Sequence, residues 1–197
     1  MKQTEITVQV FSSVEKVEEI LKKQDFKLKE RFVLKDYYFT NFYKKDLQNK
    51  SYKELMENSI LVRSVVCNGN EKNQLIFKNK NIDESGNVLS EEKLCTRLND
   101  FDAALKIFAA AKFNCWCDLT QNVVVYKKDE TEICIQDVEG LGVFIEYEEE
   151  PNMEQLLEEE KINAMITNLK SLNLDIGKDF SCKKVYMKYY LNQKSTN

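Results

Sequence analysis

The stretch Thr131-Glu-Ile-Cys-Ile-Gln-Asp-Val-Glu-Gly-Leu-Gly-Val-Phe-Ile-Glu-Tyr-Glu-Glu-Glu-Pro151 decides which fold this chain can adopt. Two segments in it, Thr131–Val138 and Val143–Glu149, alternate between apolar and polar side chains. Between them lies Glu139-Gly-Leu-Gly142, which carries the glycines that tight turns favour. Two alternating segments around such a turn predict a β-hairpin.

The second strand of this hairpin has one polar face. Because successive side chains of a strand point to opposite sides, Glu146 and Glu148 share a face with Phe144. The other face is apolar and consists of Val143, Ile145 and Tyr147. If the polar face lines a cavity, Glu146 and Glu148 are candidate ligands for a cation. The alternative is that both carboxylates are solvated on an exposed strand face.

Length and composition favour a single globular domain over residues 1–197. The chain has 197 residues, of which 43% are hydrophobic, with only one Pro and five Gly. This length matches one domain, and the scarcity of Gly and Pro argues against long flexible linkers. The formal net charge of −4 gives no broadly basic surface, so we expect no nucleic-acid partner.

Residue types that are missing exclude several chemistries. The chain contains no histidine, which excludes His-based catalytic dyads, triads and zinc sites. Its six cysteines are scattered without a Cys-x-x-Cys pair, so we expect reduced thiols in a cytoplasmic protein. The N-terminal residues lack a signal-peptide core, and no 18-residue apolar run predicts a membrane span.

The remaining sequence predicts an α+β fold with an antiparallel sheet. Thr4–Phe11 alternates like a half-buried strand, and Ser12-Ser-Val-Glu15 matches a capping box with Ser12 as the N-cap of a first helix. A second helix is expected over Phe101–Lys112, and a third after Pro151 with Asn152 as its cap. Further strands are expected within Phe26–Tyr43, Ser59–Cys67, Gln74–Lys80, Leu89–Leu98 and Phe113–Lys127. About eight strands in local order are typical of an antiparallel sheet, open or closed.

The hairpin and the order of elements resemble the CYTH superfamily, the triphosphate tunnel metalloenzymes, in its class IV adenylate cyclase-like and thiamine triphosphatase-like branch. The best match is Asp137-Val-Glu-Gly-Leu-Gly-Val-Phe-Ile-Glu-Tyr-Glu148, and the resemblance covers nearly the whole chain. Weaker matches are Asp36-x-Tyr38-Phe39, Arg63, Lys78 and Ser90-x-Glu92 followed by Asp100. The resemblance implies an eight-stranded antiparallel closed β-tunnel with helices packed outside.

The resemblance also implies a ligand and a metal ion. In the family, basic residues inside the tunnel bind a triphosphate, and acidic residues hold Mg²⁺ or Mn²⁺. Lysine and arginine suit phosphate oxygens, and a hard cation bridges those oxygens to carboxylates. At the matching positions, the expected triphosphate-binding residues are Arg63, Lys78 and Lys80, and the expected metal ligands are Glu5, Glu92, Glu146 and Glu148.

This chain departs from the family at the tunnel cations. The first-strand signature Glu-x-Glu-x-Lys is here Glu5-x-Thr7-x-Gln9. Neutral residues stand at four positions where the family has a cation: Gln9, Leu61, Gln121 and Val123. A hydrogen bond to a charged group contributes about 1.5–3 kcal/mol, so losing three would weaken triphosphate binding by about 4–9 kcal/mol if the effects add.

Three functions are compatible with these residues. The first is a metal-dependent enzyme acting on a nucleoside triphosphate or another triphosphate, as an adenylate cyclase or as a triphosphatase. The second is a catalytically inactive sensor that binds a nucleotide or another polyanion. The third is a structural interaction module that retains only the fold. The sequence leaves open whether the chain forms a homodimer.

Overall fold

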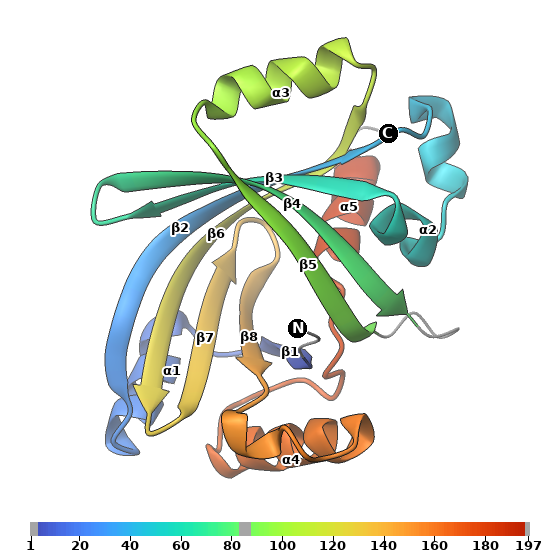
Figure 1. Cartoon of the computed structure of the whole chain (residues 1–197). Coiled ribbons are helices and arrows are strands. Elements are labelled where there is room, and N and C mark those ends of the chain that lie inside the picture. Colours follow the sequence, from blue (N-terminus) through green and yellow to red (C-terminus); the bar gives the residue numbers. More distant parts are fainter. Residues whose placement is uncertain (1–3, 83–87, 196–197) are drawn as a thin grey trace. The chain divides into compact units, whose positions relative to one another are not determined.

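The computed structural model describes residues 4–82 and 88–195, with the side chains of residues 79–91 and 195 left out of the description. The strands of the described residues are β1 Glu5–Val10, β2 Lys27–Thr40, β3 Ser59–Cys67, β4 Asn70–Ile82, β5 Val88–Leu98, β6 Asn114–Lys128, β7 Thr131–Val138 and β8 Gly142–Glu148. They form one eight-stranded sheet in the order β1-β8-β7-β6-β2-β3-β4-β5 (Figure 1). The predicted α+β class with an antiparallel sheet is confirmed.

Helices connect and cover these strands. The described residues contain α1 Val14–Lys23, α2 Tyr52–Glu57, α3 Phe101–Ala110, α4 Glu158–Ser171 and α5 Lys184–Ser195, with 3-10 turns η1 Lys44–Asn49 and η2 Pro151–Met153. Among them, none combines the length and the apolar character that a membrane-spanning helix requires.

Two predicted helix starts were wrong. The N-cap of α1 is Ser13 rather than Ser12, and its side chain accepts a hydrogen bond from the backbone N–H of Lys16. After Pro151 the chain forms only a 3-10 turn, and Asn152 lies inside it. Helix α4 begins later, where the carboxylate of Glu160 accepts the backbone N–H of Leu157 at 2.9 Å.

The chain divides into two compact units that are interleaved in sequence. The first unit consists of Val33–Thr120 and Lys184–Asn197, and the second of Lys2–Phe32 and Gln121–Lys183. Strands β2 and β6 contribute residues to both units.

The second unit has its core on one face of β1, β6, β7 and β8. On β1 the buried residues are Ile6, Val8 and Val10, and they pack with Leu21 of α1 and Leu169 of α4. Because side chains alternate across a strand, the opposite face carries the polar set. This polar face consists of Glu5, Thr7 and Gln9 of β1, Phe144, Glu146 and Glu148 of β8, Glu132, Cys134 and Gln136 of β7, and Gln121 and Lys127 of β6.

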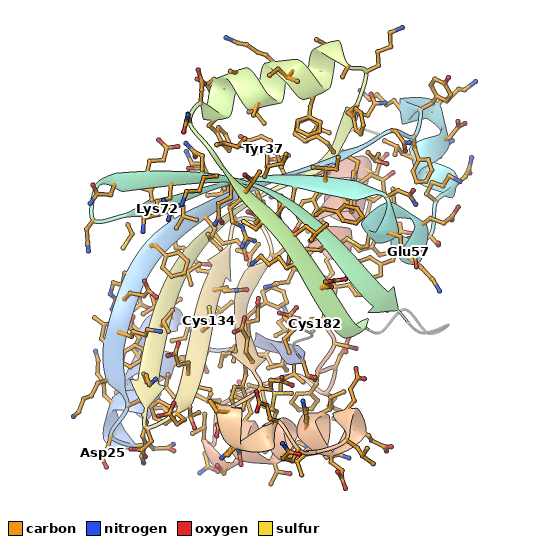
Figure 2. The ribbon with its side chains drawn as sticks, in the orientation of Figure 1. Asp25, Tyr37, Glu57, Lys72, Cys134 and Cys182 are labelled. Carbon is orange, nitrogen blue, oxygen red and sulfur yellow. The ribbon has the colours of Figure 1, made fainter. Side chains whose placement is uncertain are left out.

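The first unit has a smaller core beneath α3. Phe39 of β2, Val62 of β3 and Ala104 of α3 are buried together there. Figure 2 labels Tyr37 at this contact, where its ring centroid lies 5.7 Å from that of Phe101. Packing of α3 on this face leaves the other face of the same strands to carry Asp36 and Arg63 (β2 and β3).

The outer edge of β1 is bonded to the segment that precedes α5. The N–H of Thr7 donates to the carbonyl of Phe180 at 2.9 Å, and the N–H of Cys182 donates to the carbonyl of Thr7 at 3.0 Å. The carbonyl of Gln9 accepts the N–H of Gly177 at 2.8 Å. Since these backbone groups are already bonded, they are not available to another strand. The sheet order of the described residues therefore ends at β1, and the predicted closed tunnel is not confirmed.

Candidate metal centre

The hairpin of β7 and β8 sets the register of the polar face. Gly142 has φ of +96°, a conformation that side-chain-bearing residues rarely adopt, so glycine fixes the turn. Strand β8 then pairs with β1, which places Glu148 opposite Glu5 and Glu146 opposite Thr7. Residues from opposite ends of the sequence thereby share one face of the second unit.

Three carboxylates gather on this face. Glu5, Glu146 and Glu148 each contribute an oxygen atom, and the three oxygens lie within 4.8 Å of one another. Glu5 and Glu146 are half-buried, and Glu148 is exposed. Two like charges about 4 Å apart repel by about 1 kcal/mol even in water, and by more where water is partly excluded. A divalent cation would relieve this repulsion, and three carboxylate oxygens are the hard ligands that Mg²⁺ and Mn²⁺ take.

Gln136 of β7 holds one of these carboxylates. Its Nε2 donates to Oε2 of Glu146 at 2.7 Å, and its side chain is 4% exposed. The same amide lies 3.6 Å from the sulfur of Cys134, which is labelled on β7 in Figure 2. Sequence reasoning missed Gln136. The signal was available, because the glycine turn sets the β7–β8 register and alternation then puts Gln136 and Glu146 on one face.

The fourth predicted metal ligand, Glu92, lies elsewhere in the fold. It belongs to β5 in the first unit, where its backbone pairs with Asn79 and its side chain is exposed. It is not a member of the three-carboxylate group. The pattern around Glu92 predicted a strand correctly, but a strand position alone does not tell which charges it will meet.

Arg63 is bound by a carboxylate of its own unit. Its Nε donates to Oδ1 of Asp36 at 2.7 Å, and its Nη2 donates to Oδ2 at 2.6 Å. The side chain of Asp36 is 1% exposed and that of Arg63 is 17% exposed. Two of the five N–H groups of the arginine predicted to bind phosphate therefore donate to the buried Asp36 instead.

The two predicted phosphate-binding lysines lie on β4. The β3–β4 register pairs Arg63 with Gln74, so Lys78, four residues after Gln74, points to the same face as Arg63. Lys78 is half-buried and pairs with Lys93 of β5. The side chain of Lys80 lies outside the described residues.

Two lysines of the second unit share one glutamate. Glu132 lies 2.7 Å from Nζ of Lys29 and 3.3 Å from Nζ of Lys127. Although burial opposes ionisation, hydrogen bonds from both lysines hold the pKa of Glu132 below its ordinary value. Lys127, the cation on β6 of the polar face, is therefore already ion-paired.

The neutral residues at the expected cation positions are mostly buried. Leu61 is 2% exposed and Val123 is 1% exposed, so both are parts of packed interiors. Gln121 is 4% exposed, and its Oε1 accepts no hydrogen bond from any residue that the structure describes. None of these side chains can supply the charge that a lysine or arginine would bring to a phosphate.

Comparisons with known proteins extend these observations. No protein-family model matches the chain. Over 188 residues it is 29% identical to a protein of Methanocaldococcus jannaschii that bears the name "putative adenylate cyclase", and the alignment covers 95% of this chain and 97% of that protein.

Solved structures share the fold. The PH1819 protein of Pyrococcus horikoshii matches with a TM-score of 0.67 and 17% identity over 96% of this chain and 99% of its own. A Hippeastrum protein, described as a "putative adenylyl cyclase" with a dominant triphosphatase activity, matches with a TM-score of 0.63 and 15% identity over 98% and 96%. A chain of the Schizosaccharomyces pombe Mediator head module matches with a TM-score of 0.59 and 10% identity over 89% and 98%. At these identities the likeness concerns the fold alone.

Proposed function

We propose that the protein binds a nucleoside triphosphate or another triphosphate together with a divalent metal ion. The confirmed resemblance of this chain to the CYTH superfamily supports this ligand class. The observation that carries this proposal is the group formed by Glu5, Glu146 and Glu148. The names of two similar proteins, a "putative adenylate cyclase" and a "putative adenylyl cyclase" with a dominant triphosphatase activity, support a triphosphate as the ligand.

Four residues of the second unit would form the metal site. Glu5, Glu146 and Glu148 would hold Mg²⁺ or Mn²⁺, while Gln136 keeps the Glu146 carboxylate oriented through its 2.7 Å hydrogen bond. A bound divalent ion supplies a Lewis acid that offsets charge on phosphoryl oxygens. A donor that hydrogen-bonds a metal-ligating carboxylate, as Gln136 would, orients that carboxylate and tunes the affinity for the metal.

Arg63 and Lys78, which belong to the first unit, remain the predicted phosphate-binding residues. Because Arg63 is already hydrogen-bonded to Asp36, we expect the protein's own cations to bind a triphosphate weakly. We therefore expect triphosphate binding to depend strongly on the metal ion. Two reactions fit such a complex. In a cyclase the 3′-hydroxyl of ATP attacks the α-phosphorus and pyrophosphate leaves, whereas in a triphosphatase water attacks the terminal phosphorus and inorganic phosphate leaves.

A specific observation favours binding without turnover as the second candidate. Neutral residues stand at Gln9, Leu61, Gln121 and Val123, where the family has cations, and Leu61 and Val123 are only 2% and 1% exposed. A sensor needs to recognise a polyanion but not to stabilise the charge that develops during phosphoryl transfer. The shared fold of the Mediator subunit also shows that this architecture occurs in a protein of a large assembly.

Product analysis tests these alternatives. Purified protein is incubated with ATP, inorganic triphosphate or thiamine triphosphate, each with Mg²⁺ or with Mn²⁺. Cyclic AMP with pyrophosphate would identify a cyclase, and released phosphate a triphosphatase. Thermal stabilisation by a triphosphate that requires the metal, without any product, would favour the sensor. If neither turnover nor stabilisation occurs, the proposed ligand class is wrong and the structural module stands.

A further inference from the structure

The second unit contains a cavity on the sheet face opposite the three carboxylates. Its volume is about 300 Å³, and it lies between the last turn of α4, the end of α1 and the β6–β7 turn. Tyr147 of β8 lines it, whereas Glu146 and Glu148 point to the polar face on the other side of the same strand. The cavity is therefore separate from the proposed metal centre.

The hydroxyl groups of Thr131 and Ser171, which line the cavity, each donate a hydrogen bond within the chain. The hydroxyl of Thr131 donates to Oε1 of Glu150 at 2.6 Å, and that of Ser171 donates to the carbonyl of Asn168 at 2.7 Å. A hydroxyl has a single proton and two lone pairs. Toward the cavity, Thr131 and Ser171 can therefore only accept hydrogen bonds.

Two amides and a carboxylate add further acceptors. Nδ2 of Asn168 donates to the hydroxyl of Tyr147 at 3.2 Å, and Nε2 of Gln24 donates to the carbonyl of Leu172 at 2.8 Å. Their side-chain oxygens, like the carboxylate of Asp129, accept no hydrogen bond from the described parts of the chain. Each amide keeps one N–H, but the lining as a whole offers more acceptors than donors.

Two helix C-termini add partial negative charge at the cavity, and Lys22, Lys23 and Lys170 in the last turns of these helices offset part of it. Helices α1 and α4 both end here, with C-caps Gln24 and Leu172, and a helix C-terminus carries a partial negative charge. Glu150 behind the wall is only 7% exposed, and its bonded partners are the neutral hydroxyls of Thr131 and Tyr147.

One cation of the chain already uses this wall. Nζ of Lys128 donates to the backbone carbonyl of Gln24 at 2.9 Å and lies over the ring of Phe26, 5.9 Å from its centroid. Lys128 adds positive charge at the rim, which opposes a second cation, while Asp129 beside it adds a compensating negative charge. The contact of Lys128 shows that a primary ammonium group fits the carbonyl end of α1.

We propose that this cavity is an amine pocket, which binds a small primary ammonium cation on a short alkyl chain. The acceptor-rich lining and the two helix ends would take the three N–H donors of the ammonium group. The buried side chains of Phe26, Ile133, Leu169 and Leu172 provide an apolar floor for the alkyl chain.

Ligand-detected NMR and thermal shift assays with butylammonium test the proposal, in EDTA so that no metal site contributes. We expect saturable binding and a rise in Tm. Tetramethylammonium, which has the charge without N–H donors, and butyrate, which has the chain with the opposite charge, should both bind at least about tenfold more weakly, as expected for loss of the charged hydrogen bonds. Absence of saturable butylammonium binding, or equal binding of tetramethylammonium, would overturn the proposal. Tighter binding of butyrate would also overturn it, since it would mark an anion site built on Lys128.

A matched pair of variants locates the binding. Asp129 has φ of +51°, a conformation that asparagine tolerates well, so Asp129→Asn removes the charge without straining the turn. Glu130→Gln makes the same change at the next residue of this turn, which does not line the cavity. We expect Asp129→Asn to weaken butylammonium binding about three- to tenfold and Glu130→Gln to leave it nearly unchanged. Equal effects of the two variants would show non-specific attraction and refute the pocket. Because the assay needs neither metal nor triphosphate, its result is independent of the proposed function.

Discussion

Charged side chains on the strands of the two units behave in opposite ways. In the first unit, Asp36 and Arg63 form a bidentate ion pair whose carboxylate is 1% exposed. In the second unit, Glu5, Glu146 and Glu148 bring three like charges together in partly exposed positions. A buried charge needs its partner inside the chain, whereas a partly exposed cluster of like charges can recruit a cation from solution. We therefore expect the first arrangement to stabilise the fold, and we propose that the second binds a metal ion.

The largest expected effect comes from breaking the ion pair of the first unit. Arg63→Ala leaves the Asp36 carboxylate buried without its partner, which should lower the free energy of unfolding by about 3–5 kcal/mol. Urea denaturation followed by circular dichroism measures the change. Lys16→Ala is the control, since Lys16 belongs to an exposed ion pair with Glu19 and its removal should change little.

An apolar double replacement sharpens this test. Asp36→Leu combined with Arg63→Met removes both charges and should recover most of the stability that Arg63→Ala loses, because a buried pair can often be replaced by packed apolar side chains. If Arg63→Ala is as mild as the Lys16 control, the ion pair does not stabilise the fold, and phosphate binding is the role that remains for Arg63.

The next effect concerns the carboxylates of the second unit. A metal ion present at 100 times its Kd should stabilise the protein by about 2.7 kcal/mol, and Glu146→Gln with Glu148→Gln should abolish this gain. The metal-free Tm of the double variant is the reference from which this gain is measured. Thermal unfolding with and without Mn²⁺ measures both values. Glu154→Gln with Glu159→Gln, which changes the same charge at exposed positions, should respond to Mn²⁺ like the unmodified protein. An unchanged Mn²⁺ response of the Glu146/Glu148 variant would remove the metal centre from this face.

A smaller effect should follow from removing the donor that orients Glu146. Gln136→Met keeps the volume of the side chain but loses the 2.7 Å hydrogen bond, and we expect Mn²⁺ affinity to fall about tenfold, or about 1.4 kcal/mol. Isothermal titration calorimetry gives the Kd. Gln121→Met is the matched control, since Gln121 lies equally buried on the same face without a described contact to the carboxylates. Equal losses in both variants would mean that Gln136 acts only through packing.

Local patterns allowed much of the fold to be predicted from the sequence. Alternation identified β1, and alternation with a glycine turn identified the β7–β8 hairpin, including the faces of Glu146 and Glu148. The helix expected over Phe101–Lys112 is α3, and the structure shows Asp100 as its N-cap; such signals act within a few residues. The joining of Glu5 with Glu146 and Glu148 came from the family resemblance, since no local pattern pairs the first strand with the last.

The parts that were not predicted depend on distant partners. Helix α5 is rich in tyrosine, a residue type that favours strands. Its tyrosines are placed by ring contacts with distant residues, such as that of Tyr189 with Trp116, which the local sequence does not indicate. The sheet order ends at β1, whose outer edge forms backbone hydrogen bonds with the segment before α5. Backbone hydrogen bonds of this kind leave no pattern in the side chains from which they could be predicted. The ion pair of Asp36 and Arg63 depends on the β2–β3 register, which places the two residues opposite each other. The family pattern instead predicts that Arg63 binds phosphate.

The smallest expected effect tests the rule behind the comparison, that buried polar groups need partners. The Oε1 atom of Gln121 is buried without a hydrogen bond from the described residues, so Gln121→Met should raise the free energy of unfolding by about 1 kcal/mol through relief of a desolvation penalty. Gln136→Met, in which a bonded amide of the same exposure is lost, should lower it. Urea titration of the two variants side by side gives opposite signs if the rule holds. A loss of stability in Gln121→Met would contradict this expectation and would show that the Gln121 amide is hydrogen-bonded in solution.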